Sequence, residues 1–357
     1  MRRHRPRPRS RPRAAGAGGG GGVAAAWTVS VLLALGVVAT WPRSTPAAPL
    51  ARGSAAPSPS APAAAAATPS AAASTPAPTS TSAPAISARR MRERLTRALD
   101  RYLRGRPGHL SLSFRDQATG FTFTYRPEAR IVTASIVKVD ILVALLLKAQ
   151  RERRRLTSSE RSLARQMIEF SDNKAANALW QAAGGAAGLA AANRRLRLRD
   201  TSPGAGGVWG VTTTSAADQI RVLRALTSAG SPLSERHRGY VLDLMSRVTP
   251  EQAWGVSAAA TATAAGTATA AGTKAGADAS VALKNGWLPR PVDGGQWTIN
   301  SIGRVRENGA TGHDRPDGHD YLIAVLSKQH PSMGAGVETV EHAVRLVIST
   351  LRAAGRG

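Results

Sequence analysis

The stretch "TASIVKVDIL", residues 133–142, sets one lysine inside an otherwise apolar run. The helix that starts here, "SIVKVDILVALLLKAQ", is apolar nearly all round, which predicts that it is buried within the protein. Ser135 lies at its N-terminus, where the helix dipole and free N–H groups favour negative charge. Lys138 follows one turn later, so its amine can lie beside the serine oxygen. A Ser cap followed by a surface Lys is the ordinary alternative.

The lysine at position 138 is informative because Arg is the usual cation of this chain. Only six of the 48 basic residues are Lys. Arg does not release its proton in a protein, whereas burial lowers the pKa of a Lys and lets the neutral amine accept a proton. Lys138 is therefore a candidate base for activating the Ser135 hydroxyl.

A second motif, "FSDNKAANALW", begins at residue 170. Ser171 could relay a proton to a leaving nitrogen. Asn173 could hydrogen-bond both the Lys138 amine and a substrate amide. The alternative is an ordinary helix N-cap, for which Ser and Asp are well suited.

A third motif, "VALKNGWLP" at residues 281–289, ends a strand-like run. Lys284 offers a positive charge to a substrate carboxylate, and Gly286 permits close backbone approach. The N–H of Trp287 could face an oxyanion. The alternative is a simple turn, because Asn-Gly is a favoured turn pair.

The three motifs, in this order, resemble the signature of class A β-lactamases and penicillin-binding proteins, and the resemblance covers residues 88–354. It implies that Ser135 is the nucleophile and Lys138 its activating partner, that Ser171 moves the proton and that Asn173 positions the substrate. It further implies that Lys284 binds the substrate carboxylate, and that the N–H groups of Ser135 and Trp287 bind the oxyanion. No cofactor and no metal are expected.

Two features depart from the family pattern. The family motif usually has Thr or Ser where this chain has Asn285. Class A β-lactamases also carry a Glu in the loop after the second motif, where it activates the deacylating water. The corresponding loop, "RLRLRDTSPGAGGVWGVTTT", contains no Glu, and Asp200 is its single carboxylate. We therefore expect acylation of Ser135 to be easier than deacylation.

Hydrophobic periodicity predicts an α+β fold. An antiparallel sheet is built from both chain ends and flanked by helices, and an all-helical domain is inserted into it, as in the β-lactamase and transpeptidase folds. A repetitive Ala/Thr/Gly stretch at 257–277 is interpreted as a flexible surface insertion. The expected elements are a helix from residue 87 to 103, strands at 109–116 and 121–127, helices between 135 and 248, strands at 280–286, 296–306 and 320–327, and a helix over 337–351.

The region before this domain has a different composition. Residues 1–22 form a basic tail predicted to be disordered, and residues 23–41 are apolar over about the length that spans a bilayer. This segment is a membrane anchor or a signal peptide, with the preceding Arg residues in the cytoplasm. Residues 42–87 are rich in Pro, Ala, Ser and Thr and form a linker to the hydrolase domain at 88–357.

Composition excludes several other functions. The chain has no Cys, so thiol catalysis, Cys metal sites and disulfides are excluded. Its net charge is +26, but aromatic residues make up only 4% and no nucleic-acid recognition motif is present, so nucleic-acid binding is not expected. The His313-Asp314 and His319-Asp320 pairs are interpreted as turn residues between strands rather than as metal ligands.

The expected protein is an extracytoplasmic, monomeric serine hydrolase, tethered to the membrane by its N-terminal segment or secreted. Its reaction would be acyl transfer through an acyl-serine intermediate on β-lactams or related amides. Two alternatives remain at this point. One is a D,D-peptidase acting on peptidoglycan stem peptides, and the other is a penicillin sensor or wall-binding protein that does not turn over.

Overall fold

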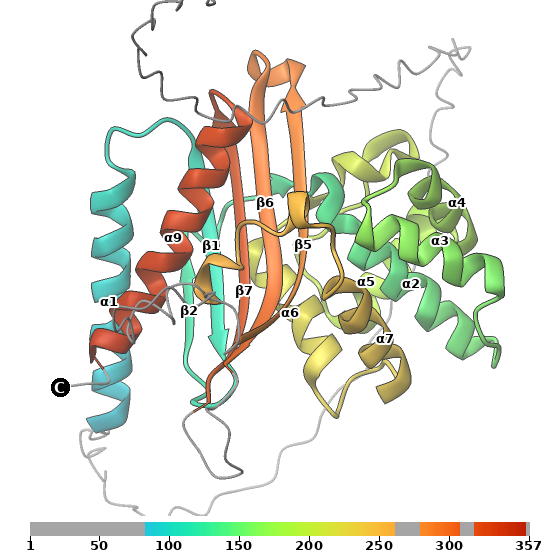
Figure 1. The fold of residues 1–357 in the computed structure, drawn as a ribbon, viewed down its shortest axis with the longest axis horizontal. Helices are drawn as coiled ribbons and strands as arrows, with labels where there is room; N and C mark the ends of the chain where they lie inside the picture. The colour runs from blue at the N-terminus through green and yellow to red at the C-terminus, as the bar shows by residue number, and fades with distance from the viewer. Residues whose placement is uncertain (1–82, 261–278, 308–317, 355–357) are drawn as a thin grey trace, which may run out of the picture. The chain divides into compact units, whose positions relative to one another are not determined.

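The computed structural model describes residues 83–260, 279–307 and 318–354 (Figure 1). The predicted basic tail, the apolar segment at 23–41, nearly all of the linker and most of the insertion at 257–277 lie outside these residues. The His313-Asp314 pair also lies outside them. Within the described ranges, no helix combines the length and apolar character needed to cross a bilayer.

A five-stranded antiparallel sheet forms the centre of the domain, with the strand order β2-β1-β7-β6-β5. Strands from both ends of the domain are therefore neighbours, and Ser111 of β1 lies opposite Leu326 of β7. This arrangement confirms the α+β fold predicted from the sequence. The strands are β1 at His109–Asp116, β2 at Thr122–Tyr125, β5 at Ala279–Arg290, β6 at Gln296–Glu307 and β7 at Asp320–His330.

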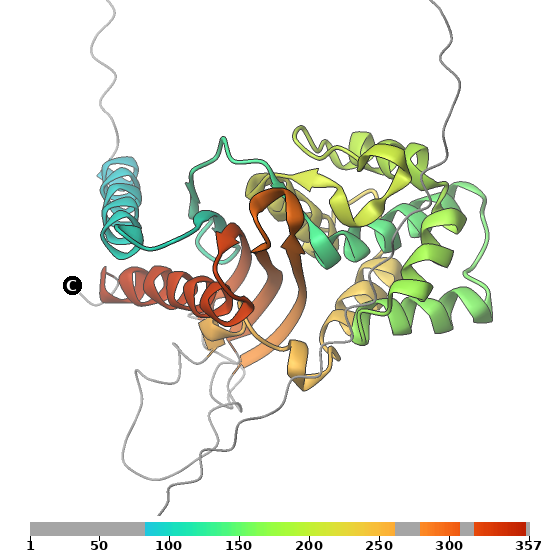
Figure 2. The same cartoon turned by 90° about the horizontal axis from the view of Figure 1, so that it is seen from above.

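Helices cover both faces of this sheet (Figures 1 and 2). The first and last helices, α1 and α9, pack together on one face, and α9 contacts β6 and β7. The helices from the middle of the chain lie on the opposite side, where α6 contacts β1 and β7. The bounds are α1 Ala83–Leu103, α2 Val137–Arg151, α3 Ser158–Glu169, α4 Asn173–Ala183, α5 Gly185–Leu196, α6 Ala216–Thr227, α7 Glu235–Met245 and α9 Met333–Ala354.

Strand β7 separates two hydrophobic cores because successive side chains of a strand point to opposite faces. Tyr321, Ile323 and Val325 belong to the core under α1 and α9. Leu322, Ala324 and Leu326 belong to the core of the helical part. All six side chains are at most 2% exposed. Full burial of a Leu, Ile or Val side chain stabilises the fold by about 1.5–3 kcal/mol.

Helix α2 is the central helix of the helical part. Its side chains from Val137 to Leu147 are all buried, and it contacts α4 and α5. The prediction of a buried helix after residue 135 is therefore confirmed. Its N-terminus lies against the sheet, since the turn before α2 contacts both β5 and β6.

A second, two-stranded sheet was not predicted from the sequence. It pairs β3, Ile131–Val132, with β4, Thr213–Thr214. Each strand is only two residues long, so neither produces a recognisable alternating pattern. This pairing places the end of the long loop between α5 and α6 beside the segment that leads into Ser135.

Candidate active site

Ser135 lies in the 3-10 turn Ala134–Ile136, immediately before α2. The side chain is half-buried, while its neighbours Ala134 and Ile136 are buried. Ala134 has a φ of 47°, a left-handed conformation that is uncommon for a residue with a Cβ atom. Such strain costs on the order of 1–3 kcal/mol and persists only where surrounding contacts enforce it.

Two residues of the sheet enforce this turn. The Asn300 side-chain amide, on β6, donates hydrogen bonds to the carbonyls of Val132 (2.8 Å) and Thr133 (3.0 Å). Gly286, on β5, lies directly against the turn, because a Cβ atom at this position would come within 2.8 Å of the Ser135 nitrogen. The close backbone approach predicted for Gly286 is therefore present, and any larger residue would displace the turn.

The Lys138 amine is directed toward the second motif. It donates to the Ser171 carbonyl (2.6 Å), contacts the Ser171 Oγ (3.1 Å) and donates to the Asn173 Oδ1 (2.8 Å). The contact suggested between Lys138 and Asn173 is thus present. In the part of the chain that the structure describes, no hydrogen bond joins Lys138 to Ser135.

The local structure of the second motif explains how it presents these groups. Asp172 is the N-cap of α4, and its side chain accepts a hydrogen bond from the Ala175 N–H at 2.6 Å. Ser171, just before this cap, has a left-handed φ of 55°. This kink lets both the carbonyl and the hydroxyl of one residue face the Lys138 amine.

Burial changes the basicity of Lys138. Its side chain is fully buried, and desolvation lowers its pKa to about 7, although the nearby Asp172 charge opposes the shift. A neutral amine has two N–H donors and one lone pair. The two shortest Lys138 contacts are to oxygens that can only accept, and the third is to a hydroxyl that can donate. These contacts accommodate an uncharged amine, in which the Ser171 hydroxyl donates to the lone pair, as well as an ammonium group that donates to all three oxygens.

Lys284 contacts the same hydroxyl. Its amine lies 3.1 Å from the Ser171 Oγ, 3.1 Å from the Asn285 carbonyl and 3.4 Å from the Gln252 Oε1. Desolvation, and secondarily the positive charge of Lys138, place the pKa of Lys284 well below its usual value. The Ser171 Oγ therefore bridges two buried amines.

Asn285 has a structural role on β5. Its side-chain amide donates to the backbone carbonyls of Gln252 (2.7 Å) and Trp254 (2.9 Å) and so ties the 252–254 segment to the strand. Next along β5, Trp287 packs edge-on against Trp254 with ring centroids 6.2 Å apart. A Thr or Ser at position 285 would place a hydroxyl here in place of the amide. Asn285 instead donates both of its side-chain N–H groups to backbone carbonyls of the protein.

Two residues of the site were missed by sequence reasoning. Gln252 contacts Lys284 through its Oε1 and donates from its Nε2 to the Phe170 carbonyl at 3.0 Å. The Trp209 ring lies 5.1 Å from the Lys138 amine, and its indole N–H donates to Asn177 at 2.7 Å. Neither residue belongs to a local motif, because each contact joins segments more than 30 residues apart.

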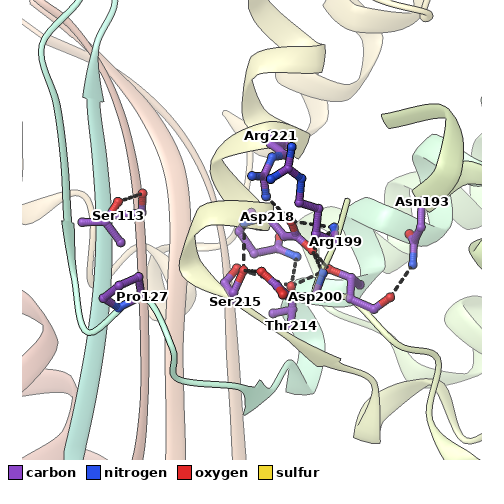
Figure 3. Close-up of polar contacts among 12 residues, drawn as sticks. Ser113, Pro127, Asn193, Arg199, Asp200, Thr214, Ser215, Asp218 and Arg221 are labelled. Atoms are coloured by element: carbon purple, nitrogen blue, oxygen red, sulfur yellow. Dashed lines mark hydrogen bonds and ion pairs between the residues drawn. The ribbon is translucent and has the colours of Figure 1, made fainter. Parts of the chain in front are cut away.

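The loop between α5 and α6 is held at its base by a polar network (Figure 3). The buried Asp218 carboxylate accepts hydrogen bonds from the backbone N–H groups of Arg199 and Asp200 and also pairs with Arg221. Asp200 in turn pairs with Arg130 at 2.5 Å and accepts from the Ser215 hydroxyl at 3.0 Å. The single carboxylate of this loop is thus engaged in contacts that fix the loop.

The described histidines and acids do not assemble a metal site. Within the described ranges, no group of three His, Cys, Asp or Glu side chains could hold an ion. His319 lies 2.8 Å from Asp116, which raises the pKa of the imidazole by hydrogen bonding. Asp320 pairs with Arg304 at 2.6 Å. Both residues therefore join neighbouring strands at the end of the sheet.

Comparison with known proteins identifies the family of this chain. The family described as "Beta-lactamase enzyme family" matches residues 94–161 and 155–351. Proteins of Mycobacterium tuberculosis and Mycobacterium bovis, each named "Putative lipoprotein LppW", are 27% identical over 242 residues, which covers 66% of this chain and 68% of theirs.

Solved structures share the fold. PBP-A aligns with a TM-score of 0.58 at 20% identity, covering 73% of this chain and 96% of PBP-A. A PBP-A mutant in an acyl-enzyme complex with penicillin G gives the same TM-score and identity, covering 74% and 97%. A class A β-lactamase from Bacteroides cellulosilyticus aligns at 0.57 with 16% identity, covering 74% and 99%. The family match spans most of the chain, and the protein therefore belongs to the β-lactamase enzyme family.

Proposed function

We propose that this protein is an exported serine hydrolase that transfers the acyl group of β-lactams or related amides to Ser135. The observation that supports this best is the position of the Ser171 Oγ, 3.1 Å from the Lys138 amine and 3.1 Å from the Lys284 amine. Two buried amines around one hydroxyl form a path for a proton. The half-buried Ser135, which directly follows the strained Ala134, precedes Lys138 by one helical turn.

In the acylation step, the neutral Lys138 amine accepts the Ser135 hydroxyl proton as the Oγ attacks the carbonyl carbon. This requires Lys138 to exchange a contact with Ser171 or Asn173 for one with Ser135, as often happens when a substrate tightens catalytic hydrogen bonds. The negative charge on the carbonyl oxygen is stabilised by the N–H groups of Ser135 and Trp287. Gly286 supports this proposal because it brings β5 against the turn that contains Ser135.

The amide C–N bond then breaks, and the leaving nitrogen takes a proton from the Ser171 hydroxyl. Ser171 regains a proton from the protonated Lys138, which returns the amine to its neutral form. Asn173, exposed at the start of α4, offers its side-chain amide to the substrate. Lys284 binds the carboxylate of an anionic substrate, since the anion would offset the desolvation that lowers its pKa.

Hydrolysis of the acyl-serine ester needs a base that activates water. The loop between α5 and α6 places the Trp209 ring near Lys138, and its one carboxylate, Asp200, is engaged with Arg130 and Ser215. These contacts favour slow deacylation. They also give specific support to a second function, a penicillin receptor that is acylated and releases its product slowly.

The proposed location is outside the cytoplasm. The mycobacterial relatives are named as lipoproteins, but this chain contains no Cys that could carry a lipid. We assign the tether instead to the apolar segment 23–41, with residues 42–87 as a linker to the hydrolase domain. A peptidoglycan stem peptide or a β-lactam could reach a domain held in this way.

The proposal is tested by incubating the purified protein with benzylpenicillin and recording the intact mass. The expected result is an increase of one penicillin per chain, with the modified peptide containing Ser135. Ser135→Ala should abolish the adduct, while an exposed control serine, Ser158→Ala, should not. An adduct on another residue, or none at any concentration, would rule out the proposed chemistry.

A further inference from the structure

The amine of Lys284 is enclosed by the protein's own acceptors. As an ammonium group it has three N–H donors, and three oxygens surround it: the Ser171 Oγ, the Asn285 carbonyl and the Gln252 Oε1. Lys284 is completely buried. A substrate carboxylate can therefore bind this amine only by displacing one of the three oxygens.

The Gln252 oxygen is the one most easily displaced. Its contact with Lys284 is the longest of the three, at 3.4 Å. The Asn285 carbonyl belongs to the backbone of β5, which is paired with β6 along its whole length. The Ser171 hydroxyl is shared with Lys138. Gln252, by contrast, reaches Lys284 through a side chain with rotatable bonds.

The backbone and the amide nitrogen of Gln252 hold this oxygen in place. Its carbonyl accepts from the Asn285 side chain at 2.7 Å, and its Nε2 donates to the Phe170 carbonyl at 3.0 Å. Gln252 thus connects the segment before Ser171 to the strand that contains Lys284. The Gln252 Oε1 belongs to an uncharged amide, so it attracts the Lys284 amine less strongly than a carboxylate would.

We propose that Gln252 determines substrate charge specificity: its Oε1 occupies the carboxylate position at Lys284 and must be displaced by an anionic substrate, whereas a neutral substrate leaves it in place. This inference rests on the proposed acylation of Ser135. The Gln252 side chain thus competes with the substrate anion for the Lys284 amine, and it takes no part in the proton path through Ser171.

The test compares two acylating agents, benzylpenicillin and its methyl ester, in which the negatively charged carboxylate is replaced by an uncharged ester. The second-order rate of Ser135 acylation is measured by intact mass for each. Gln252→Ala removes the competing oxygen, so the acid-to-ester rate ratio should rise about fivefold, the worth of about one hydrogen bond. Gln252→Glu supplies a permanent internal carboxylate, so the ratio should fall at least about tenfold through competition and like-charge repulsion.

Gln181→Ala serves as the matched control because Gln181 is an exposed glutamine on α4, and it should leave the ratio unchanged. A purely structural role for Gln252 would slow both agents equally, and an unchanged ratio in both variants would overturn the inference while leaving acylation established. If neither agent acylates the wild-type protein, the proposed function fails, and this inference fails with it. Gln252→Glu keeps nearly the same shape, so its result stands even if the Ala variant folds poorly.

Discussion

Lys138 combines properties that an Arg could not supply at the same position. It is fully buried, its pKa is lowered to about 7 by desolvation, and it contacts two oxygens that can only accept. An Arg would keep its charge and bring a larger planar group into a packed interior. The lysine is therefore the residue whose protonation should control the proposed chemistry.

The rate of acylation should follow the protonation of Lys138. The neutral amine is the reactive form, so the rate should rise with pH up to about 7 and then level off. Below that pH it should fall about tenfold per unit. The profile can be measured by quenching the reaction with benzylpenicillin at a series of times, between pH 5 and pH 9, and recording the intact mass.

Lys138→Arg is the control for this pH profile. The variant should acylate at least about 100-fold more slowly, because a positioned general base contributes roughly 10²–10⁴ in rate. Its slow rate should show no inflection near pH 7. Acylation by the Arg variant within about tenfold of wild type would mean that Lys138 acts only through its charge.

Asp140, two residues beyond Lys138 on α2, is a buried acid whose pKa is raised rather than lowered by burial. Its side chain is buried, and the Gln219 side-chain amide donates to its Oδ2 at 3.4 Å. Desolvation raises its pKa from 3.8 to about 7. The folded protein therefore holds a proton that the unfolded chain releases above pH 4, so stability from this group is complete below pH 4 and is lost as pH rises through 7.

Asp140→Asn should remove this pH dependence. The variant should gain up to roughly 4 kcal/mol relative to wild type between pH 4 and pH 8, from about three pKa units at 1.36 kcal/mol each. Urea unfolding of both proteins at pH 5, 6, 7 and 8 would measure the difference. Asp243→Asn, at an exposed ion pair, is the control and should change stability by at most about 1 kcal/mol at any pH. A stability difference between Asp140→Asn and wild type that stays constant across this range would contradict the prediction.

The loop between α5 and α6 bears on the slow deacylation that we propose. Asp218, at the first turn of α6, holds the start of the loop, and the β3–β4 pair holds its end. Between these points, Trp209 lies over the Lys138 amine. The loop is thus well fixed, but it presents an aromatic ring rather than a free carboxylate near the amine.

The penicillin adduct on Ser135 should therefore be long-lived. A missing general base costs roughly 10²–10⁴ in rate, so steady-state turnover should be slow even when acylation is fast. Asp200→Ala should change the adduct's lifetime little, because the Asp200 carboxylate is already used by Arg130 and Ser215. The decay of the adduct mass over hours would measure this. Rapid turnover that disappears in Asp200→Ala would show that Asp200 activates the water.

Across the fold, the elements with regular periodicity could be predicted from the sequence. The alternation in residues 109–116 predicted β1 with its observed bounds, and the apolar run after Ser135 predicted the buried α2. A sheet made from both ends of the domain followed from the order of elements. Contacts such as Gln252 with Lys284 could not be predicted, because neither local pattern nor spacing reveals which distant side chain fills a space between two motifs.

The two cores on either side of the sheet should unfold together. Both are lined by β7, whose alternate side chains belong to one core or the other. Leu142→Ala, in α2, and Ile348→Ala, in α9, should each destabilise the protein by about 2–5 kcal/mol. Calorimetry should show a single transition with a lowered midpoint in each variant. Because the two side chains lie in different cores, their effects should add within about 0.5 kcal/mol in the double variant. A second transition in either variant would mean that the helical part unfolds independently of the sheet, and that the helix after Ser135 is not coupled to the strand that carries Lys284.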